Sequence, residues 1–425
     1  MTVAFITLGC KVNQYETDAM AALFAKAGHT VISAGEQADV YIVNTCTVTL
    51  TADKKSRQMI ARVHALAPQA PVIAAGCYSE LSSKSVAALP GVKAVLGTEG
   101  RTEIVRIAEA LLAKESPALS HTPPFQRKEF ELLSAAAETR TRAILKVQDG
   151  CDRFCTYCTI PMARGALRSR PLPDCIRELK QLKDNGYKEA VLTGIELSLY
   201  GKDAKEGAGL TELLAALSDV GLERIRLGSL DPTVVTERFA DTCAALPALC
   251  RHFHLALQSG SATVLERMKR GYTPEEYRRA VQLLRERMPE AGITTDIIAG
   301  FPGETEQEHR ETAAFVREIA FSRLHVFPYS RRPGTRADKM EGQLSRREKE
   351  ARTQELIAIG TALEAAFIEN QLGTTVSVLT ENDGTGYSGN YIRVKTGREE
   401  GALVTCRLTE RDGLLALGTP VDPAG

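Results

Sequence analysis

The chain has 425 residues, too many for one ordinary hydrophobic core, so its length predicts two or three domains. Lysine plus arginine and aspartate plus glutamate each total 53, and the resulting zero net charge gives no overall attraction to a polyanion. No stretch has the length of an apolar membrane-spanning helix, and the amino terminus lacks the basic start of a signal peptide. We therefore expect a cytoplasmic protein without membrane contact, whose ten cysteines serve a metal or catalysis rather than disulfides.

Residues 1–113 repeat one pattern, in which a short apolar run ends in a cysteine and a segment with helical periodicity follows. The repeat length is close to that of a βαβ unit, so the strands should be parallel and the cysteines should meet at the carboxyl edge of one sheet. Three converging thiolates predict an iron–sulfur cluster, and the alternative is three unrelated buried cysteines. The runs are 3–9, 39–45 and 70–76, the helices include 18–27 and 52–66, and the cysteines are Cys10, Cys46 and Cys77.

Residues 114–139 are predicted to be a linker, because they lack periodicity and contain several prolines. A β-branched run at 143–147 then predicts a strand that ends at Gly150. Cys151, Cys155 and Cys158 follow it in C-x3-C-x2-C spacing. Three thiolates from one loop can hold three irons of a [4Fe–4S] cluster and leave the fourth iron open for a small molecule, beside which Tyr157 can pack.

Two other metal sites compete with this open cluster. A structural zinc site needs four ligands, usually as two paired half-sites, and the sequence has no second CxxC pair. A ferredoxin loop carries a C-x2-C-x2-C run with a further cysteine before proline, which this loop lacks. The spacing therefore favours the open cluster.

From residue 140 to about residue 330, predicted strands alternate with predicted helices, which predicts a partial parallel βα-barrel with its site on the loops after the strands. Polar residues gather on these loops, among them Gly194, Glu196, Ser229 and Gln258. The expected strands are 143–147, 189–193, 224–227, 252–257, 294–298 and 324–328, and the helices include 176–185, 274–287 and 304–319.

Residues 343–370 are predicted to form a long charged helix, and residues 371–425 alternate apolar and polar side chains between glycine-rich turns. This alternation predicts a small antiparallel β-barrel with strands at 375–380, 391–395 and 402–409. The expected fold is thus α/β and multidomain, with a parallel N-terminal sheet domain (1–113), a linker (114–139), a partial barrel with its final helix (140–370) and the small β-barrel (371–425). We interpret the remaining cysteines as structural: Cys175, Cys243, Cys250 and Cys406.

The loop from Cys151 to Cys158 resembles the cluster motif of radical S-adenosylmethionine (SAM) enzymes. In that family the amine and carboxylate of SAM bind the open iron, and the reduced cluster splits SAM into methionine and a 5′-deoxyadenosyl radical. The mechanism is implied by the resemblance, whereas the spacing is read directly from the sequence.

Nearly the whole chain resembles the radical-SAM methylthiotransferases, which join a three-cysteine domain, a radical-SAM barrel and a C-terminal TRAM domain. The resemblance rests on the six cysteines with their flanking motifs and on residues 254–261, 268–272 and 296–304. It implies SAM and two [4Fe–4S] clusters, an auxiliary one on the N-terminal cysteines and a SAM-binding one on the loop cysteines, all six being catalytic. The implied residues of the SAM pocket are Tyr157, Gly194, Glu196, Ser229, Gln258, Arg270 and Asp296.

Residues 10–16 and 325–330 most resemble the branch that acts on N6-threonylcarbamoyladenosine in tRNA. The implied product is 2-methylthio-N6-threonylcarbamoyladenosine at adenosine 37, beside the anticodon. The threonyl carboxylate needs cationic or hydroxyl partners, although solvent exposure is the alternative for the two arginines among the candidates. The branches for isopentenyladenosine tRNA and for a ribosomal-protein aspartate are alternatives. The candidate substrate-binding residues are Tyr329, Ser330, Arg331 and Arg332.

The implied partners are the anticodon loop of tRNA and a low-potential electron donor of the flavodoxin or ferredoxin type. Two basic groups are candidates for contacts with phosphates, and solvated charge is the alternative, equally weighted for the second group. Two further functions remain open, an Fe–S electron carrier and a zinc-containing RNA-binding module. The first basic group is Arg164, Arg168 and Arg170, and the second is the helix face with Lys54, Lys55, Arg57 and Arg62.

Overall fold

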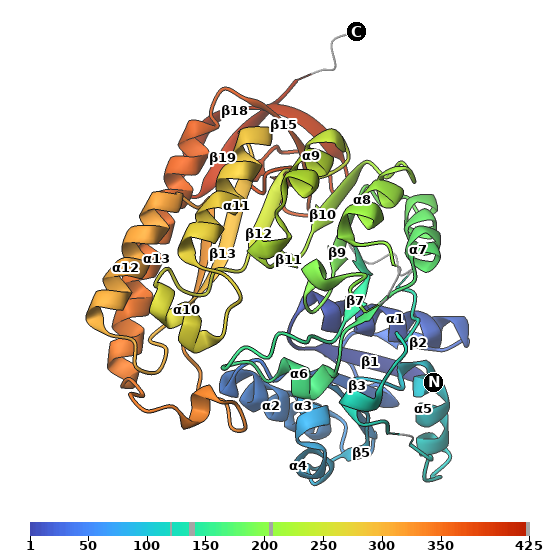
Figure 1. Ribbon diagram of the computed structural model, residues 1–425. Helices are drawn as coiled ribbons and strands as arrows, with labels where there is room; N and C mark the ends of the chain where they lie inside the picture. The colour runs from blue at the N-terminus through green and yellow to red at the C-terminus, as the bar shows by residue number, and fades with distance from the viewer. Residues whose placement is uncertain (120, 136–140, 204–206, 422–425) are drawn as a thin grey trace.

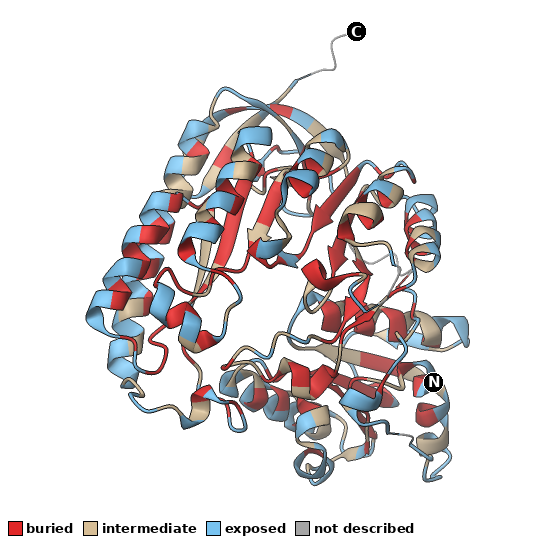
Figure 2. Cartoon of the chain, viewed as in Figure 1, coloured by how far each residue is buried: buried red, intermediate tan, exposed pale blue. Residues whose placement is uncertain are grey.

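The computed structural model describes residues 1–119, 121–135, 141–203 and 207–421, which form three regions (Figure 1). An N-terminal α/β region lies at the bottom of the view, a curved sheet covered by helices lies above it, and a small β-barrel lies at the top. The strands of the first two regions are mostly buried, whereas the outer faces of the covering helices are exposed (Figure 2). In the described part of the chain, no helix is long and apolar enough to cross a membrane.

The N-terminal region is a five-stranded parallel sheet in the order β2-β1-β3-β4-β5. Side chains alternate along the central strand, so Ile42 packs on one face with α1 and α5, and Val43 packs on the other with α2 and α4. The strands are β1 (Thr2–Thr7), β2 (Thr30–Ile32), β3 (Val40–Thr45), β4 (Val72–Gly76) and β5 (Val92–Val95). The helices are α1 (Lys11–Lys26), α2 (Leu50–Leu66), α3 (Cys77–Leu81), α4 (Ser83–Ala87) and α5 (Ile104–Leu112), and the 3-10 helix η1 is Arg101–Glu103.

Helix α1 begins at Lys11, directly after Cys10, although the sequence predicted a start at residue 18. The missed turns carry the polar residues Asn13 and Glu16, which are both buried. Hydrogen bonds and ion pairs, rather than apolar contacts, hold these side chains in the interior. An apolar pattern therefore could not reveal this part of the helix.

The predicted linker packs closely against the N-terminal region. Leu133 and Ala135 are buried against Tyr15 of α1, and the Tyr15 hydroxyl donates a hydrogen bond to the carbonyl of Leu133. Arg127 forms an ion pair with Glu80 at 2.9 Å. Residues 120 and 136–140 lie outside the described residues, and the 3-10 helix η2 is Pro124–Gln126.

The second region confirms the predicted partial barrel of parallel strands, which curves from β6 to β14. The strands are β6 (Ala143–Lys146), β9 (Glu189–Thr193), β10 (Arg224–Leu227), β11 (Ser229–Leu230), β12 (His252–Leu255), β13 (Gly292–Ala299) and β14 (Arg323–Pro328). A short antiparallel pair, β7 (Gln148–Asp149) and β8 (Arg168–Ser169), flanks the cysteine loop. The helices are α6 (Ile160–Arg164), α7 (Leu172–Asp184), α8 (Leu210–Ser218), α9 (Glu237–Ala245), α10 (Ala262–Met268), α11 (Pro274–Arg287) and α12 (Glu306–Ile319), with 3-10 helices η3 (Leu197–Leu199), η4 (Pro232–Val234) and η5 (Ala337–Lys339).

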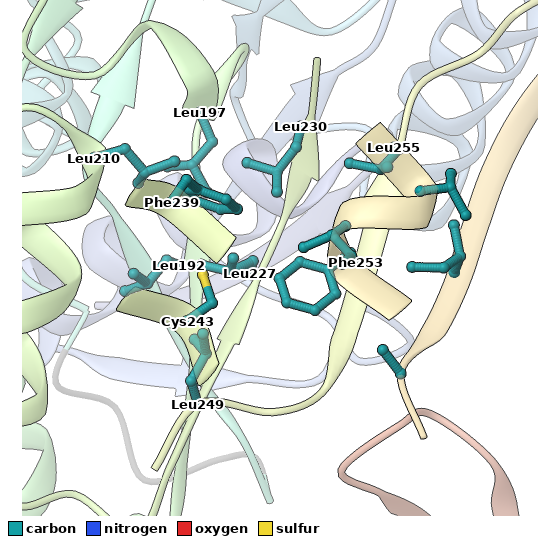
Figure 3. Packing of buried hydrophobic residues seen from close by; sticks show 14 of the residues in the cluster. Leu192, Leu197, Leu210, Leu227, Leu230, Phe239, Cys243, Leu249, Phe253 and Leu255 are labelled. Atoms are coloured by element: carbon teal, nitrogen blue, oxygen red, sulfur yellow. The ribbon is translucent and has the colours of Figure 1, made fainter. Parts of the chain in front are cut away.

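The barrel sheet divides at Gly228, where β10 pairs with β9 and the following β11 pairs with β12. A Cβ atom at Gly228 would lie 2.8 Å from the carbonyl oxygen of Leu192, so only glycine allows this close approach. Behind the sheet, Phe239 and Cys243 of α9 pack on Leu227 and Phe253 (Figure 3). The interpretation of Cys243 as a structural core residue agrees with this packing.

Helix α13 (Arg346–Asn370) leads into a closed barrel in the strand order β15-β16-β17-β19-β18. Its interior holds Val378, Val394 and Cys406. The predicted small β-barrel is confirmed, although only three of its strands were predicted. The missed strands are β16, with the sequence Thr-Gly-Tyr-Ser, and β19, with Leu-Ala-Leu-Gly-Thr-Pro, which lack the β-branched apolar residues of the predicted strands. The strands are β15 (Thr375–Thr380), β16 (Thr385–Ser388), β17 (Arg393–Lys395), β18 (Leu403–Asp412) and β19 (Leu415–Pro420).

Candidate functional site

The N-terminal cysteines follow three adjacent strands, as the repeat pattern predicted. Cys10 follows β1, Cys46 follows β3 and Cys77 follows β4, and these strands are neighbours in register at their carboxyl ends. Cys46 and Cys77 are buried, whereas Cys10 is exposed. The parallel sheet thus brings together residues that lie far apart in the sequence.

The second cysteine set occupies the loop between β7 and α6. Gly150 has φ +71°, and a Cβ atom there would lie 1.9 Å from the carbonyl oxygen of Ala166, so the tight entry to the loop requires glycine. The Cys158 amide donates to the carbonyl of Cys155 at 3.0 Å, and the Ile160 amide donates to the Cys158 sulfur at 3.4 Å. Backbone hydrogen bonds therefore fix the direction of the loop.

Arg270 contacts this loop from the end of α10. Its guanidinium donates to the Cys155 sulfur at 3.3 Å and to an Asp231 carboxylate oxygen at 3.0 Å. Asp231 also pairs with Arg153 of the cysteine loop at 3.2 Å. These contacts connect the cysteine loop to the loop that follows β11.

The other predicted residues of the SAM pocket lie at the same carboxyl edge of the barrel. The Gln148 side chain accepts a hydrogen bond from the Glu196 amide at 2.9 Å, and it lies so close to Gly194 that a Cβ there would be 2.7 Å away. Burial, together with the charge of Asp231, raises the pKa of Glu196. Ser229 is exposed. The backbone amide of Gln258 donates a hydrogen bond to the backbone carbonyl of Asp296 at 2.9 Å. The Tyr157 ring makes an edge contact with the ring of Phe301. Their roles toward SAM stay a prediction.

A buried network of charges connects the two cysteine sets. Arg164 of α6 donates to Glu16 at 2.8 Å, to Asn13 at 2.8 Å and to Asp149 at 3.1 Å. Lys146 pairs with Glu16 at 2.8 Å, and Arg101 pairs with the same carboxylate at 2.9 Å. Burial alone would raise the pKa of Glu16, but these three cations outweigh it and lower the pKa to about 2. Glu16 is therefore the anionic centre of the joint between the N-terminal region and the cysteine loop.

The expectation that Arg164, Arg168 and Arg170 contact phosphates is wrong. All three are buried, with at most 5% of their surface exposed. Arg164 lies in the network above, Arg168 lies near Asp149, and Arg170 pairs with Glu178. Their charges are compensated inside the protein, which a sequence pattern could not show.

Two of the four candidate substrate residues after β14, Ser330 and Arg332, contact helix α2. Arg332 donates to Asp53 at 2.7 Å and to the Thr47 hydroxyl at 2.6 Å, and it is 5% exposed. Ser330 accepts a hydrogen bond from the Leu50 amide, Tyr329 packs on Phe301, and the exposed Arg331 pairs with Asp338. In this structure Arg332 connects the barrel to the N-terminal region, and the roles of the four residues toward the substrate stay a prediction.

A polar cavity that sequence reasoning missed opens between the three regions beside Cys10. It has a volume of about 510 Å³ and is lined by Lys11 and Gln14 of α1, by Arg142 and Arg226, and by Tyr391 of the C-terminal barrel. Burial, and then Arg226 and Arg142, lower the pKa of Lys11. The sequence signal for this cavity was the motif at residues 10–16, which also contains the cysteine.

The chemistry of both cysteine sets fits a cluster held by three thiolates. All six cysteines are free, and burial raises the pKa of Cys77, Cys151 and Cys158 to about 12. Bound iron would place a positive charge beside each buried sulfur and so stabilise the thiolate form. The Thr159 hydroxyl, next to Cys158, donates a hydrogen bond to the carbonyl of Thr47, next to Cys46, at 3.5 Å, so the two cysteine sets lie close together. Within the described ranges, no three His, Cys, Asp or Glu side chains are arranged to hold a single metal ion.

Comparisons with known proteins agree with this architecture. The radical SAM superfamily matches residues 145–316, and the uncharacterized protein family UPF0004 matches residues 2–97. Among solved structures, the radical SAM methyltransferase TsrM from Kitasatospora setae has a TM-score of 0.59 at 19% identity, over 79% of this chain and 76% of that one. The fold and the cysteine loop thus define a radical SAM enzyme, which implies one [4Fe–4S] cluster and SAM.

Curated relatives match over nearly the full length. The threonylcarbamoyladenosine tRNA methylthiotransferase MtaB of Bacillus subtilis is 41% identical over 92% of this chain and 90% of its own. The MtaB of Thermotoga maritima is 37% identical over 97% and 98%. The tRNA-2-methylthio-N(6)-dimethylallyladenosine synthase of Desulforamulus reducens is 33% identical over 89% and 84%. The chain belongs to the radical-SAM methylthiotransferase family, in the branch of the MtaB proteins.

Proposed function

We propose that the protein converts N6-threonylcarbamoyladenosine in tRNA to its 2-methylthio derivative, at the adenosine beside the anticodon. The observation that carries this proposal is the 41% identity to an MtaB protein along almost the whole chain. Both cysteine sets are present, and the hydrogen bond between Thr159 and Thr47 brings the segments that carry them together. The enzyme would act in the cytoplasm, where its tRNA substrate is modified.

The N-terminal cysteines would hold a second [4Fe–4S] cluster that presents sulfur to the substrate. Three free cysteines at adjacent strand ends support this assignment, because three thiolates leave one iron without a protein ligand. The buried Asn13 fixes this edge of the sheet by donating hydrogen bonds to the carbonyls of Leu8 and Thr45 at 2.8 and 3.0 Å. A flavodoxin- or ferredoxin-like protein would deliver the electron that the reaction needs.

Carbon 2 of adenine is an unactivated aromatic position that no side-chain acid or base can substitute. The SAM-binding cluster, when present, supplies the carbon radical chemistry that this step requires. The residues of the chain have the remaining tasks of binding and orientation. Arg270 compensates charge at the Cys155 sulfur, and the Glu16 network holds the cysteine loop against the N-terminal sheet. A fixed separation between the two cysteine sets lets both act on one base.

Exposed apolar side chains beside both cysteine sets can contact a base that has left its stack. Val48 follows Cys46, Phe154 precedes Cys155, and Phe327 lies at the end of β14, each at least 42% exposed. An adenosine of the anticodon loop is already single-stranded, so extruding it costs little. On α2, Lys54, Lys55 and Arg62 are exposed and available to phosphates.

The test is a side-by-side assay of the purified, reconstituted enzyme under anaerobic conditions. One tRNA carries threonylcarbamoyladenosine and the other carries isopentenyladenosine, the substrate type named for the 33% identical relative. We expect methylthiolation of the first tRNA and little of the second, measured by mass spectrometry of the nucleosides. Preference for the second tRNA would refute the branch assignment, and no product on either would refute the proposed reaction.

A further inference from the structure

We propose that Lys11 binds the carboxylate of the threonyl group on the substrate adenosine, inside the cavity beside Cys10. This inference rests on the proposed function and adds a residue that selects the substrate. The cavity, of about 510 Å³, falls within the range of small-molecule sites. Residues of the N-terminal sheet, the central barrel and the C-terminal barrel all line it.

Two of the three cations that line the cavity are already committed inside the protein. Arg226 pairs with Glu189 at 2.8 Å and donates to the carbonyls of Ser388 and Gly389 at 3.0 and 3.1 Å. Arg142 pairs with Glu381 and lies over the ring of Tyr387 at 5.1 Å. Neither arginine is free to give its full charge to a ligand.

Lys11 is the uncommitted cation of this cavity. Within the described ranges its ammonium makes no hydrogen bond or ion pair, and Lys11 is exposed to solvent at the wall of the cavity, although the surrounding protein partly desolvates it. The lining carboxylates do not satisfy it, because Glu381 is bound by Arg142 and Glu400 accepts a hydrogen bond from Thr141 at 3.0 Å. A carboxylate that enters the cavity therefore meets an ammonium with free donors.

The position of Lys11 relative to the proposed sulfur donor matches the shape of the substrate. Cys10 lines the same cavity and directly precedes Lys11. Carbon 2 and the N6 substituent lie on the same six-membered ring of adenine, so a base whose carbon 2 faces the N-terminal cysteines can place its N6 substituent in the cavity. The start of α1 is held in place by Asn13 and Glu16, which fixes the backbone of Lys11.

This arrangement distinguishes substrates by the charge of their N6 substituent. A threonyl carboxylate pairs with the ammonium, whereas an isopentenyl group would cover the ammonium and leave it unpaired, which costs free energy. Lys11 is therefore a different structural candidate for the specificity that the sequence analysis placed at residues 329–332, because Arg332 pairs with Asp53 and Arg331 pairs with Asp338.

The test measures binding of three anticodon stem–loop RNAs to the reconstituted enzyme. The RNAs carry threonylcarbamoyladenosine, its uncharged threoninamide analogue, or isopentenyladenosine. We expect the wild type to prefer the carboxylate over the amide by about tenfold or more, as expected for a charge-assisted contact. Lys11→Met should lose this preference while binding the amide RNA as the wild type does, and Lys11→Arg should retain part of it.

Lys26→Met is the matched control, because Lys26 is exposed at the other end of the same helix and should not affect the preference. The inference is overturned if Lys11→Met keeps the preference, if it weakens all three RNAs equally, or if Arg331→Met abolishes the preference instead. Equal iron content in all variants shows that the clusters are intact. A wild type that methylthiolates the threonylcarbamoyl tRNA but does not distinguish acid from amide refutes this inference alone, whereas failure to methylthiolate it refutes the proposed function.

Discussion

Replacing Glu16 by glutamine should loosen the joint between the N-terminal region and the cysteine loop. The Glu16 carboxylate is fully buried and accepts from Arg101, Arg164 and Lys146. A neutral amide would leave these cations with less compensating charge in a site that excludes water. Asp149 and Glu131 remain as partners, so the joint should weaken without being abolished.

The size of the effect follows from the pKa of Glu16. A fall of this pKa from an ordinary 4.5 to about 2 corresponds to roughly 3 kcal/mol in favour of the folded protein. This agrees with the ~3–5 kcal/mol that removal of one partner from a buried ion pair costs. For domains of this size the loss should lower the melting temperature by about 6–12 °C.

Thermal unfolding of anaerobically reconstituted Glu16→Gln and wild type provides the measurement. Glu350→Gln is the control, because Glu350 forms an exposed ion pair with Arg346 at 2.6 Å and should shift the melting temperature by no more than about 2 °C. A lowered carboxyl pKa stabilises the fold above the unfolded pKa and loses that effect as the pH falls toward the folded pKa. The difference in melting temperature between Glu16→Gln and wild type should therefore be constant from pH 5 to 8. It should become smaller below about pH 4.5, because the wild-type carboxylate then loses its stabilising effect. A melting temperature within the control range would refute the reasoning.

Three further predictions concern the cysteines and the contact at Arg332. Reconstituted enzyme should bind about eight irons per chain, and a value near four that does not change when the three N-terminal cysteines become alanine would contradict the auxiliary cluster. Cys155→Ala should abolish 5′-deoxyadenosine formation with dithionite and keep about four irons, and wild-type turnover would disprove its role. Arg332→Ala should leave Asp53 unpaired and cost about 3–5 kcal/mol in thermal unfolding, whereas the exposed Arg331→Ala should be nearly neutral, and equal losses would count against the contact.

The local pattern of the sequence was sufficient for most helices and strands and for both cysteine sets. Alternation of apolar runs with helical segments predicted both parallel sheets, because burial of strands and of one helix face leaves a short-range periodicity in the chain. The pattern failed where buried side chains are polar, as at the first turns of α1. It failed again where strands lack β-branched apolar residues, as at β16 and β19.

The sequence by itself determined the class of the protein, because three cysteines with fixed spacing on one loop need no distant partner to be recognised. Only the tertiary structure decided which charges are free. Arg164 pairs with Glu16, which lies 148 residues away in the sequence, and Arg332 pairs with Asp53, which lies 279 residues away. In the sequence these arginines and Lys11 are all simply cationic residues. In the folded protein the arginines form buried ion pairs, whereas Lys11 lines a cavity. Charge compensation depends on contacts between distant segments, so the fold decides it.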